Sequence, residues 1–409
     1  MKNRIKKNWQ NLFLTNLFTL LNDNYLKNII YFIGVTWTLP DFLTDSLLLT
    51  LISSMLVIPY LLFTPLSGRL AVIFSKQKVY RFCKLCEFPI IIMASIALFY
   101  KSIFFCILSV FLMGIQSCLS SPSKYSIIKD IEGEERIAFG NGVMEMVAFV
   151  GILIGTILGT ILPDISSLWV ICALMIFCTT SSFFTVSRLK IEESPTEKPL
   201  FDTINPIKYM IQSYRFARQH QGINDAILGS SIFWMIAGIL QMNLIIHCRE
   251  TLLLTNIGVG LSMSCAAIGI ALGCLIAGKI IRSGNEFKMI LIGVTFMIIF
   301  MGLIIGLNPN VYLFSTLIFM FTFFGGIFDV PCLAFVQRAP IGRIVGDMMA
   351  YLNFVNFIFV LLGTALFYTI SHFTHENTLA TFSMILIILS LTLVYFGIRT
   401  FQQKKVVKN

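Results

Sequence analysis

The chain has 409 residues, of which 57% are hydrophobic and only 12% are charged. Soluble domains carry about 25% charged residues, and a water-facing surface has to be covered largely by polar groups, so this composition excludes a soluble protein. The net charge of +10 would indicate nucleic-acid binding in a soluble chain. In membrane proteins, however, basic residues collect in cytoplasmic loops. We therefore expect an all-α polytopic membrane protein with no nucleic-acid partner.

Twelve apolar segments approach the roughly 20 residues that a membrane span requires. In the first half of the chain they cover 10–35, 45–73, 82–100, 103–127, 138–163 and 166–187. In the second half they cover 222–246, 254–280, 287–306, 310–335, 345–371 and 376–399. The longest polar stretch separates the halves and contains three Pro and an amphipathic piece near 207–216. We predict a six-helix bundle at 1–187, a cytoplasmic linker at 188–221, a second six-helix bundle at 222–400 and a cytoplasmic tail at 401–409.

The basic residues between the spans predict the orientation of the chain. Nearly all of them lie on the side of the N-terminus, and the opposite side has only Lys101 and Arg249. Since cytoplasmic loops are the basic ones, we expect both termini in the cytoplasm and the protein in a bacterial inner membrane. The basic start runs into a long apolar segment without a small-residue cleavage site, which predicts a retained anchor.

The first span carries charges where a lipid-facing helix has none. Asp23 and Lys27 are four residues apart and can pair on one helix face, and Asn22, Asn24 and Asn28 surround them with amides. Ionisable groups within a span are costly and line cavities or substrate paths. The sequence predicts a substrate or coupling site that includes Asp23, Lys27 and Asn24. The alternative is a structural pair that holds neighbouring helices together.

Four further polar residues interrupt apolar spans. Glu145 lies within two turns of the cytoplasmic end of the fifth span, which favours a gating contact. Asp329 lies deeper in the tenth span and would face either a cavity or a gate. Gln241 and Asn356 are midspan amides of the seventh and eleventh spans, and they would either bind a polar headgroup or bridge helices.

Two proline elements match each other across the halves. Pro122 lies near the end of the fourth span, with Lys124 beside it and Lys129 seven residues later, and Pro331 in the tenth span has Arg338 at the same distance. Proline within a helix kinks it and frees a carbonyl group. This spacing favours an internal repeat, and we assign Pro122, Lys124, Glu145, Asp329 and Pro331 to gating or conformational change.

Small residues recur four apart in the fifth and eighth spans: Gly151, Gly155 and Gly159 in one, Gly269, Gly273 and Ala277 in the other. Such ladders allow close approach of helices in a bilayer. They predict either a sliding interface between the two spans or ordinary intramembrane packing.

No enzymatic pattern is present in the sequence. The four His have no partner pattern, and the one closely spaced pair among the ten Cys, Cys83 and Cys86, lacks the second pair or nearby His that a zinc site needs. There is also no Gly-rich phosphate loop of the P-loop type. We therefore expect a secondary transporter rather than an enzyme, with no metal and no cofactor.

Five short segments resemble motifs of the bacterial lysophospholipid transporter family of the major facilitator superfamily: LNDN (21–24), SPSKYSIIKD (121–130), GNGVMEM (140–146), GSSIFW (229–234) and GGIFDVP (325–331). The resemblance implies a major facilitator fold of two six-helix bundles with about twelve spans. It also implies that lysophospholipids, chiefly lysophosphatidylethanolamine, are flipped to the cytoplasmic leaflet. The implied partners are the lysophospholipid substrate, membrane lipids and a separate acyltransferase that restores the second chain.

The chain departs from this family at several positions. Asp23 matches the midspan Asp of the family, but Gln241 stands where the family has Arg and Asn356 stands where it has Glu. Val72 occupies the place of the usual Asp in the loop between the second and third spans. Lys27 stands where the family is apolar, so we hypothesise that it replaces the missing cation as the partner of Asp23 and of a lipid phosphate.

Two other functions remain open at this point. A symporter of a small organic ion, or an exporter of drugs or siderophores, would use Asp23 as its proton-coupling acid. A scaffold or receptor without transport activity is disfavoured, because it gains nothing from the cost of intramembrane charges.

Overall fold

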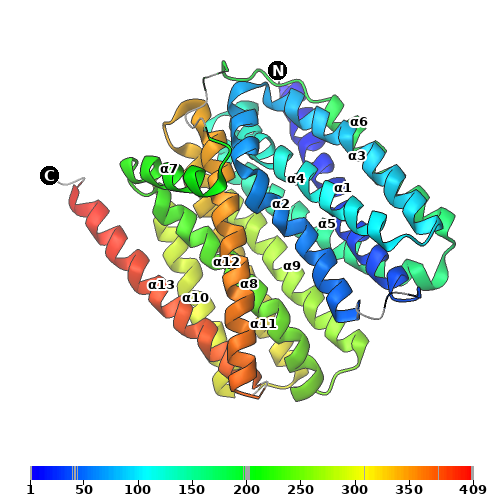
Figure 1. The fold of residues 1–409 in the computed structure, drawn as a ribbon. Helices are drawn as coiled ribbons and strands as arrows, with labels where there is room; N and C mark the ends of the chain where they lie inside the picture. Colours follow the sequence, from blue (N-terminus) through cyan, green and yellow to red (C-terminus); the bar gives the residue numbers. More distant parts are fainter. Residues whose placement is uncertain are drawn as a thin grey trace. The chain divides into compact units, whose positions relative to one another are not determined.

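Helices account for nearly all of the chain. The computed structural model describes residues 2–38, 40, 43, 45–196, 198, 203–307, 309–375 and 377–406, and in these ranges it contains thirteen α-helices and no β-strand (Figure 1). The first six are α1 (Lys2–Gly34), α2 (Asp45–Ile73), α3 (Lys76–Phe99), α4 (Ile103–Glu132), α5 (Ile137–Ile165) and α6 (Leu168–Ser187). A short α7 (Pro206–Gln219) precedes α8 (Ile223–Ile246), α9 (Asn256–Ile280), α10 (Glu286–Leu307), α11 (Val311–Arg338), α12 (Val345–Phe373) and α13 (Thr378–Val406).

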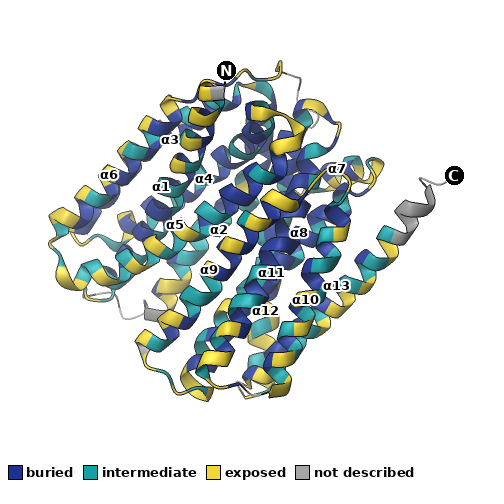
Figure 2. Ribbon diagram, turned by 180° about the vertical axis from the view of Figure 1, so that it is seen from behind, coloured by how far each residue is buried: buried dark blue, intermediate teal, exposed yellow. Residues whose placement is uncertain are grey.

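Eleven helices in the described ranges are long and apolar enough to cross a membrane. The first helix is not among them, because its basic start and the Asn, Asp and Lys residues of its middle lower its hydropathy. Exposed residues occur along most of the long helices (Figure 2), and many are large and apolar, including Phe82, Phe104 and Leu391. Exposed apolar surface on this scale marks contact with lipid rather than with water.

The helices form two compact units, and each unit combines segments from both halves of the sequence. The first unit contains Met1–Gly133, Val150–Phe216 and Pro340–Phe354, and the second contains Glu134–Phe149, Ala217–Ala339 and Val355–Asn409. The boundaries cut through α5 and α12. One end of each of these helices therefore packs with helices of the other sequence half.

In the first unit, α4 packs against α2 and α3, and α1 packs against α4 and α6. A buried apolar cluster that includes Tyr25, Ile29 and Met113 fills the space between them. The glycines of α5 allow it to lie directly on α1, since a Cβ at Gly155 would overlap the main chain of Leu21. The second half of α1, which carries Asp23 and Lys27, is thus held by close main-chain packing against α5.

In the second unit, α11 packs against α8, α9 and α10, and α13 packs against α10 and α8. A Cβ at Gly273 of α9 would overlap the carbonyl oxygen of Phe323, and one at Gly326 of α11 would overlap the main chain of Cys274. The two glycine ladders therefore pack on α1 and α11, as ordinary intramembrane packing predicts. α5 and α9 approach each other closely at Gly142 and Gly278, which lie outside both ladders.

The amphipathic piece predicted at 207–216 forms α7, whose Ile207 and Ile211 are exposed. Tyr209 on the opposite face is buried, and its hydroxyl donates a hydrogen bond to the main-chain oxygen of Asp347 (2.9 Å). The linker helix is thus fixed to the start of α12 within the first unit.

Candidate functional site

The buried carboxylate of Asp23 is the centre of a polar cluster in the first unit. Its Oδ2 accepts a hydrogen bond from Ser117 Oγ of α4 (2.9 Å), and the side chain is buried. Its Oδ1 is also buried and has no hydrogen-bond partner among the described residues. Lys84 of α3 and Lys124 of α4 attract this carboxylate electrostatically. The positive charge facing Asp23 therefore comes from α3 and α4.

The predicted pair between Asp23 and Lys27 is not formed. Lys27 is half-buried and makes no ion pair with any residue that the structure describes. Positions four apart on a helix can meet, but the Asp23 carboxylate is held by the hydroxyl group of α4 instead. The amides of Asn24 and Asn28 turn back to carbonyl groups of their own helix, at 2.9 and 2.7 Å. The first-span residues thus do not form the compact cluster that their spacing predicts.

A fully buried ion pair lies beside Asp23. Lys84 Nζ lies 2.7 Å from Glu87 Oε2, and neither side chain is exposed. Asn22 of α1 donates to Glu87 Oε1 (2.9 Å), and Thr179 of α6 donates to the same oxygen (3.2 Å). Lys84 lies three residues before Glu87 in α3, a spacing that places both on one face of the helix.

Lys124 and Pro122, predicted as gating residues, lie on α4 near this cluster. Lys124 Nζ donates to Asn16 Oδ1 (3.0 Å) and lies 4.8 Å from the centroid of the Tyr125 ring. Pro122 is buried inside α4, which continues to Glu132. The proline therefore does not mark the end of the helix, because the turns on both sides of it retain helical hydrogen bonding.

A second polar cluster lies in the second unit and joins residues that the sequence predicted separately. Asn356 Oδ1 of α12 accepts from Ser231 Oγ (2.7 Å), and Asn356 Nδ2 donates to Ser230 Oγ (3.4 Å). Ser230 Oγ in turn donates to Asp329 Oδ1 of α11 (2.7 Å). Glu145 of α5 is buried and repels Asp329 electrostatically. The two serines belong to the GSSIFW segment, whose bridging role was not predicted.

The structure does not bring Gln241 into this cluster. It lies on α8, is exposed, and has no hydrogen bond to the described part of the chain. Pro331 is buried in α11, two residues after Asp329, and like Pro122 it lies inside its helix rather than at the end. In the second unit, Asn356, Asp329 and Glu145 form one group, whereas Gln241 stands apart.

A buried arginine ties the start of α12 to the end of α2. Arg343 Nε donates to the carbonyl oxygen of Ala71 (3.3 Å), and its other nitrogens donate to the carbonyl oxygens of Phe74 and Ser194. The Glu193 carboxylate lies 3.2 Å from Nη2. A cation at the carboxyl-terminal end of a helix satisfies its last carbonyls and its dipole. Arg343 thus caps the carboxyl-terminal end of α2.

Glu193 in turn caps the start of α3. Its carboxylate accepts hydrogen bonds from Ser75 Oγ (2.9 Å), the Lys76 amide (2.7 Å) and the Gln77 amide (2.8 Å). Burial opposes ionisation, but the hydrogen bonds from Gln77, Lys76 and Ser75 outweigh it, so the pKa of Glu193 lies below its usual value. Together, Arg343 and Glu193 hold the linker against the α2–α3 turn.

The lowered pKa of Glu193 predicts how the stability of this contact depends on pH. The stabilisation is fully present above the unfolded-state pKa, whose usual value is 4.5, and is lost as the pH falls through the lower folded-state value. We expect the difference in melting temperature between the purified wild type and Glu193→Gln to stay constant from pH 8 to 6 and to shrink below pH 4.5. A difference that closes already between pH 8 and 6 would contradict this assignment.

Residues 12–364 match the sequence profile of the Major Facilitator Superfamily. The lysophospholipid transporter LplT of Photorhabdus laumondii is 26% identical over 321 residues, which cover 76% of each chain. The same transporter of Escherichia coli is 23% identical over 283 residues, or 68% of each chain. The resemblance that the motifs indicated thus extends over at least two thirds of these relatives.

Solved structures with the same fold include the human organic anion transporter MFSD10, with a TM-score of 0.76 and 13% identity over 96% of this chain and 99% of that one. The fucose:proton symporter FucP of Escherichia coli has a TM-score of 0.72 and 12% identity over 95% and 97% of the two chains. At such identities the likeness concerns the fold alone. Together with the span-length helices, the profile match establishes that this chain is a multi-pass membrane protein and belongs to the Major Facilitator Superfamily of transporters.

Proposed function

We propose that the chain transports lysophospholipids of the lysophosphatidylethanolamine type to the cytoplasmic leaflet of a bacterial inner membrane. The similarity to lysophospholipid transporters over two thirds or more of their length supports this substrate. The observation that carries the proposal is the Asp23 carboxylate, whose Oδ1 is buried without a hydrogen-bond partner among the described residues, in the field of two lysines.

This arrangement matches the chemistry of a zwitterionic headgroup. An ethanolamine ammonium group can donate a hydrogen bond to Asp23 Oδ1, which has no partner among the described residues. Hydrogen bonds between charged groups are stronger than those between neutral groups. Lys84 is already paired with Glu87. The phosphate would therefore meet Lys124 or the half-buried Lys27, which would act as point charges without the fork geometry of an arginine.

The remaining steps rest on the resemblance to the lysophospholipid transporter family. We propose that the headgroup is released at the cytoplasmic leaflet and that a separate acyltransferase restores the second chain there. Asn356 and Asp329 belong to the second unit, and we propose that their serine-linked cluster takes part in the conformational change together with Glu145.

The test is the uptake of labelled lysophosphatidylethanolamine by spheroplasts that lack their own lysolipid transporter. We expect uptake by the wild-type chain and an approximately tenfold or larger loss in Asp23→Asn, because a charge-assisted hydrogen bond is worth about 1.5–3 kcal/mol. Asp164→Asn is the matched control, since Asp164 is exposed outside the cluster and should behave as wild type.

Two results would change this proposal. If folded and inserted wild-type protein takes up no lysolipid, a small organic solute becomes the preferred substrate, with Asp23 as the proton-coupling acid. If Lys27→Ala keeps full uptake while Gln241→Ala abolishes it, Lys27 does not replace the missing cation.

A further inference from the structure

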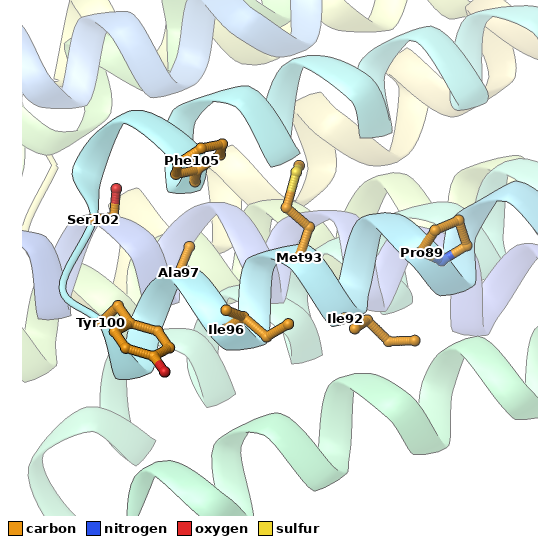
Figure 3. A pocket seen from close by; sticks show the side chains of 8 residues that line it. All are labelled: Pro89, Ile92, Met93, Ile96, Ala97, Tyr100, Ser102 and Phe105. Atoms are coloured by element: carbon orange, nitrogen blue, oxygen red, sulfur yellow. The ribbon is translucent and has the colours of Figure 1, made fainter.

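An apolar groove runs along an exposed face of α3 in the first unit. It has a volume of about 480 Å³ and lies on α3 and the start of α4 (Figure 3). The side chains that define it are Pro89, Met93, Ile96, Tyr100, Ser102 and Phe105. Ile96 and Phe105 are about half exposed, so the groove is open along its length. Only an apolar ligand or lipid fits such a lining.

The groove has the length and depth of one lipid leaflet. From Pro89 to Tyr100 the helix rises by about 16 Å at 1.5 Å per residue, which is about half of the roughly 30 Å hydrocarbon core. At the Tyr100 end, Tyr100 is 81% exposed and Trp169 of α6 is 74% exposed, with the Trp169 ring 4.6 Å from that of Phe99. Exposed Tyr and Trp mark the membrane–water interface, so the groove runs from this interface to the bilayer midplane.

A positive charge is fixed at the interfacial end of the groove. Lys101 joins α3 to α4 with a φ of +52°, a left-handed conformation that glycine usually supplies. The Lys101 amide donates to Leu98 (3.3 Å) and the Ser102 amide donates to Ala97 (2.9 Å), the hydrogen bonds of a Schellman motif. Lys101 is exposed and forms no ion pair with the residues that the structure describes. The turn thus places Lys101 between Tyr100 and Ser102, which both line the interfacial end of the groove.

We propose that this groove is a binding site for a single-chain phospholipid. The phosphate would be bound by Lys101 and Ser102, and the acyl chain would lie along Ile96 and Met93 toward Pro89. A cavity of about 150 Å³ holds one benzene, so a groove about three times as large has room for one acyl chain. The identity of the lipid as substrate rests on the proposed function. By the predicted orientation this is the outer leaflet, from which the substrate is taken.

The site can be mapped directly with a lysophosphatidylethanolamine that carries a diazirine at the end of its acyl chain. The full-length protein is reconstituted in liposomes and illuminated, and labelled peptides are located by mass spectrometry. We expect labelling near Met93, reduced at least fivefold in Met93→Trp, which fills the groove. Leu391→Trp, on an exposed apolar position of α13, is the matched control and should leave this labelling unchanged.

The contribution of the Lys101 charge to lipid binding is tested with the same photolabelling assay. We expect Lys101→Gln to reduce labelling about fivefold, the effect of one basic residue on lipid phosphate near a membrane surface, and Arg249→Gln, the other basic residue on that side, to have no effect. A two-chain phosphatidylethanolamine with the same diazirine should label α3 no more than α13. If Met93→Trp is not monodisperse, Ile96→Trp fills the same groove.

The outcomes separate this site from the transport function. Equal labelling of α3 and α13, or equal effects of Met93→Trp and Leu391→Trp, would overturn the site even if uptake is normal. Preferential labelling by the two-chain probe would overturn the single-chain assignment. Groove labelling in a protein that takes up no lysolipid would support the site and contradict only the transport proposal.

Discussion

Replacing Lys84 with Met is expected to destabilise the folded chain by about 3–5 kcal/mol, because it leaves the Glu87 carboxylate buried without its cation. The two charges lie 2.7 Å apart with both side chains fully buried. The loss should appear as a lower melting temperature of the detergent-purified protein. It should also lower the amount of monodisperse protein in the membrane fraction.

The double variant Lys84→Met/Glu87→Gln is the control for this prediction. Glutamine removes the charge but keeps an oxygen that can accept from Asn22 and Thr179, which both bind Glu87 in the wild type. Since a buried pair can often be replaced by neutral groups at little cost, we expect most of the stability to return. A single Lys84→Met variant as stable as the wild type would mean that Glu87 is not charged in the folded protein.

The second large effect is expected for Gly273→Ala. A Cβ at this position would overlap the carbonyl oxygen of Phe323, which belongs to the main chain of α11 and cannot rotate away. The two helices would have to separate, and overpacking of this kind costs about 1–3 kcal/mol. We expect a clear drop in melting temperature and in lysolipid uptake.

Gly260→Ala on the same helix distinguishes packing from helix propensity. Nothing lies within 4 Å of a Cβ at Gly260, and alanine is the better helix former by about 0.5–1 kcal/mol. This variant should be as stable as the wild type or slightly more stable. If both substitutions behave alike, the close approach of α9 and α11 does not limit stability.

The structure changes how the missing family cation is explained. The sequence analysis assigned its role to Lys27, but the residues that attract Asp23 include Lys84 and Lys124, from helices that the first span contacts only in three dimensions. Lys124 was predicted as a gating residue, and Lys84 was not among the predicted site residues. Each was recognised as a charge, but neither was predicted to lie near Asp23.

The contacts of Arg343 with the end of α2 also depend partly on local sequence and partly on tertiary packing. The absence of Asp at Val72 is readable from the sequence, and so is the basic character of the loop that holds Arg343. That Arg343 reaches the carbonyl groups of Ala71 and Phe74 depends on the packing of the α12 start with the first unit. Sequence separation of about 270 residues leaves no local pattern that would predict this contact.

The sequence by itself determined the class of the protein, its long apolar helices, the charged first helix and its likeness to lysophospholipid transporters. These properties depend on hydropathy over about 20 residues and on short motifs. Both are local features of the sequence, so they can be recognised without knowing how the helices pack. The tertiary structure alone decided that Asp23 faces Ser117 rather than Lys27, that Asn22 and Thr179 bind the Glu87 carboxylate, and that Ser230 links Asn356 to Asp329. The physical reason is that a buried charge is stabilised by whichever partner the rotation and packing of neighbouring helices bring within about 3 Å.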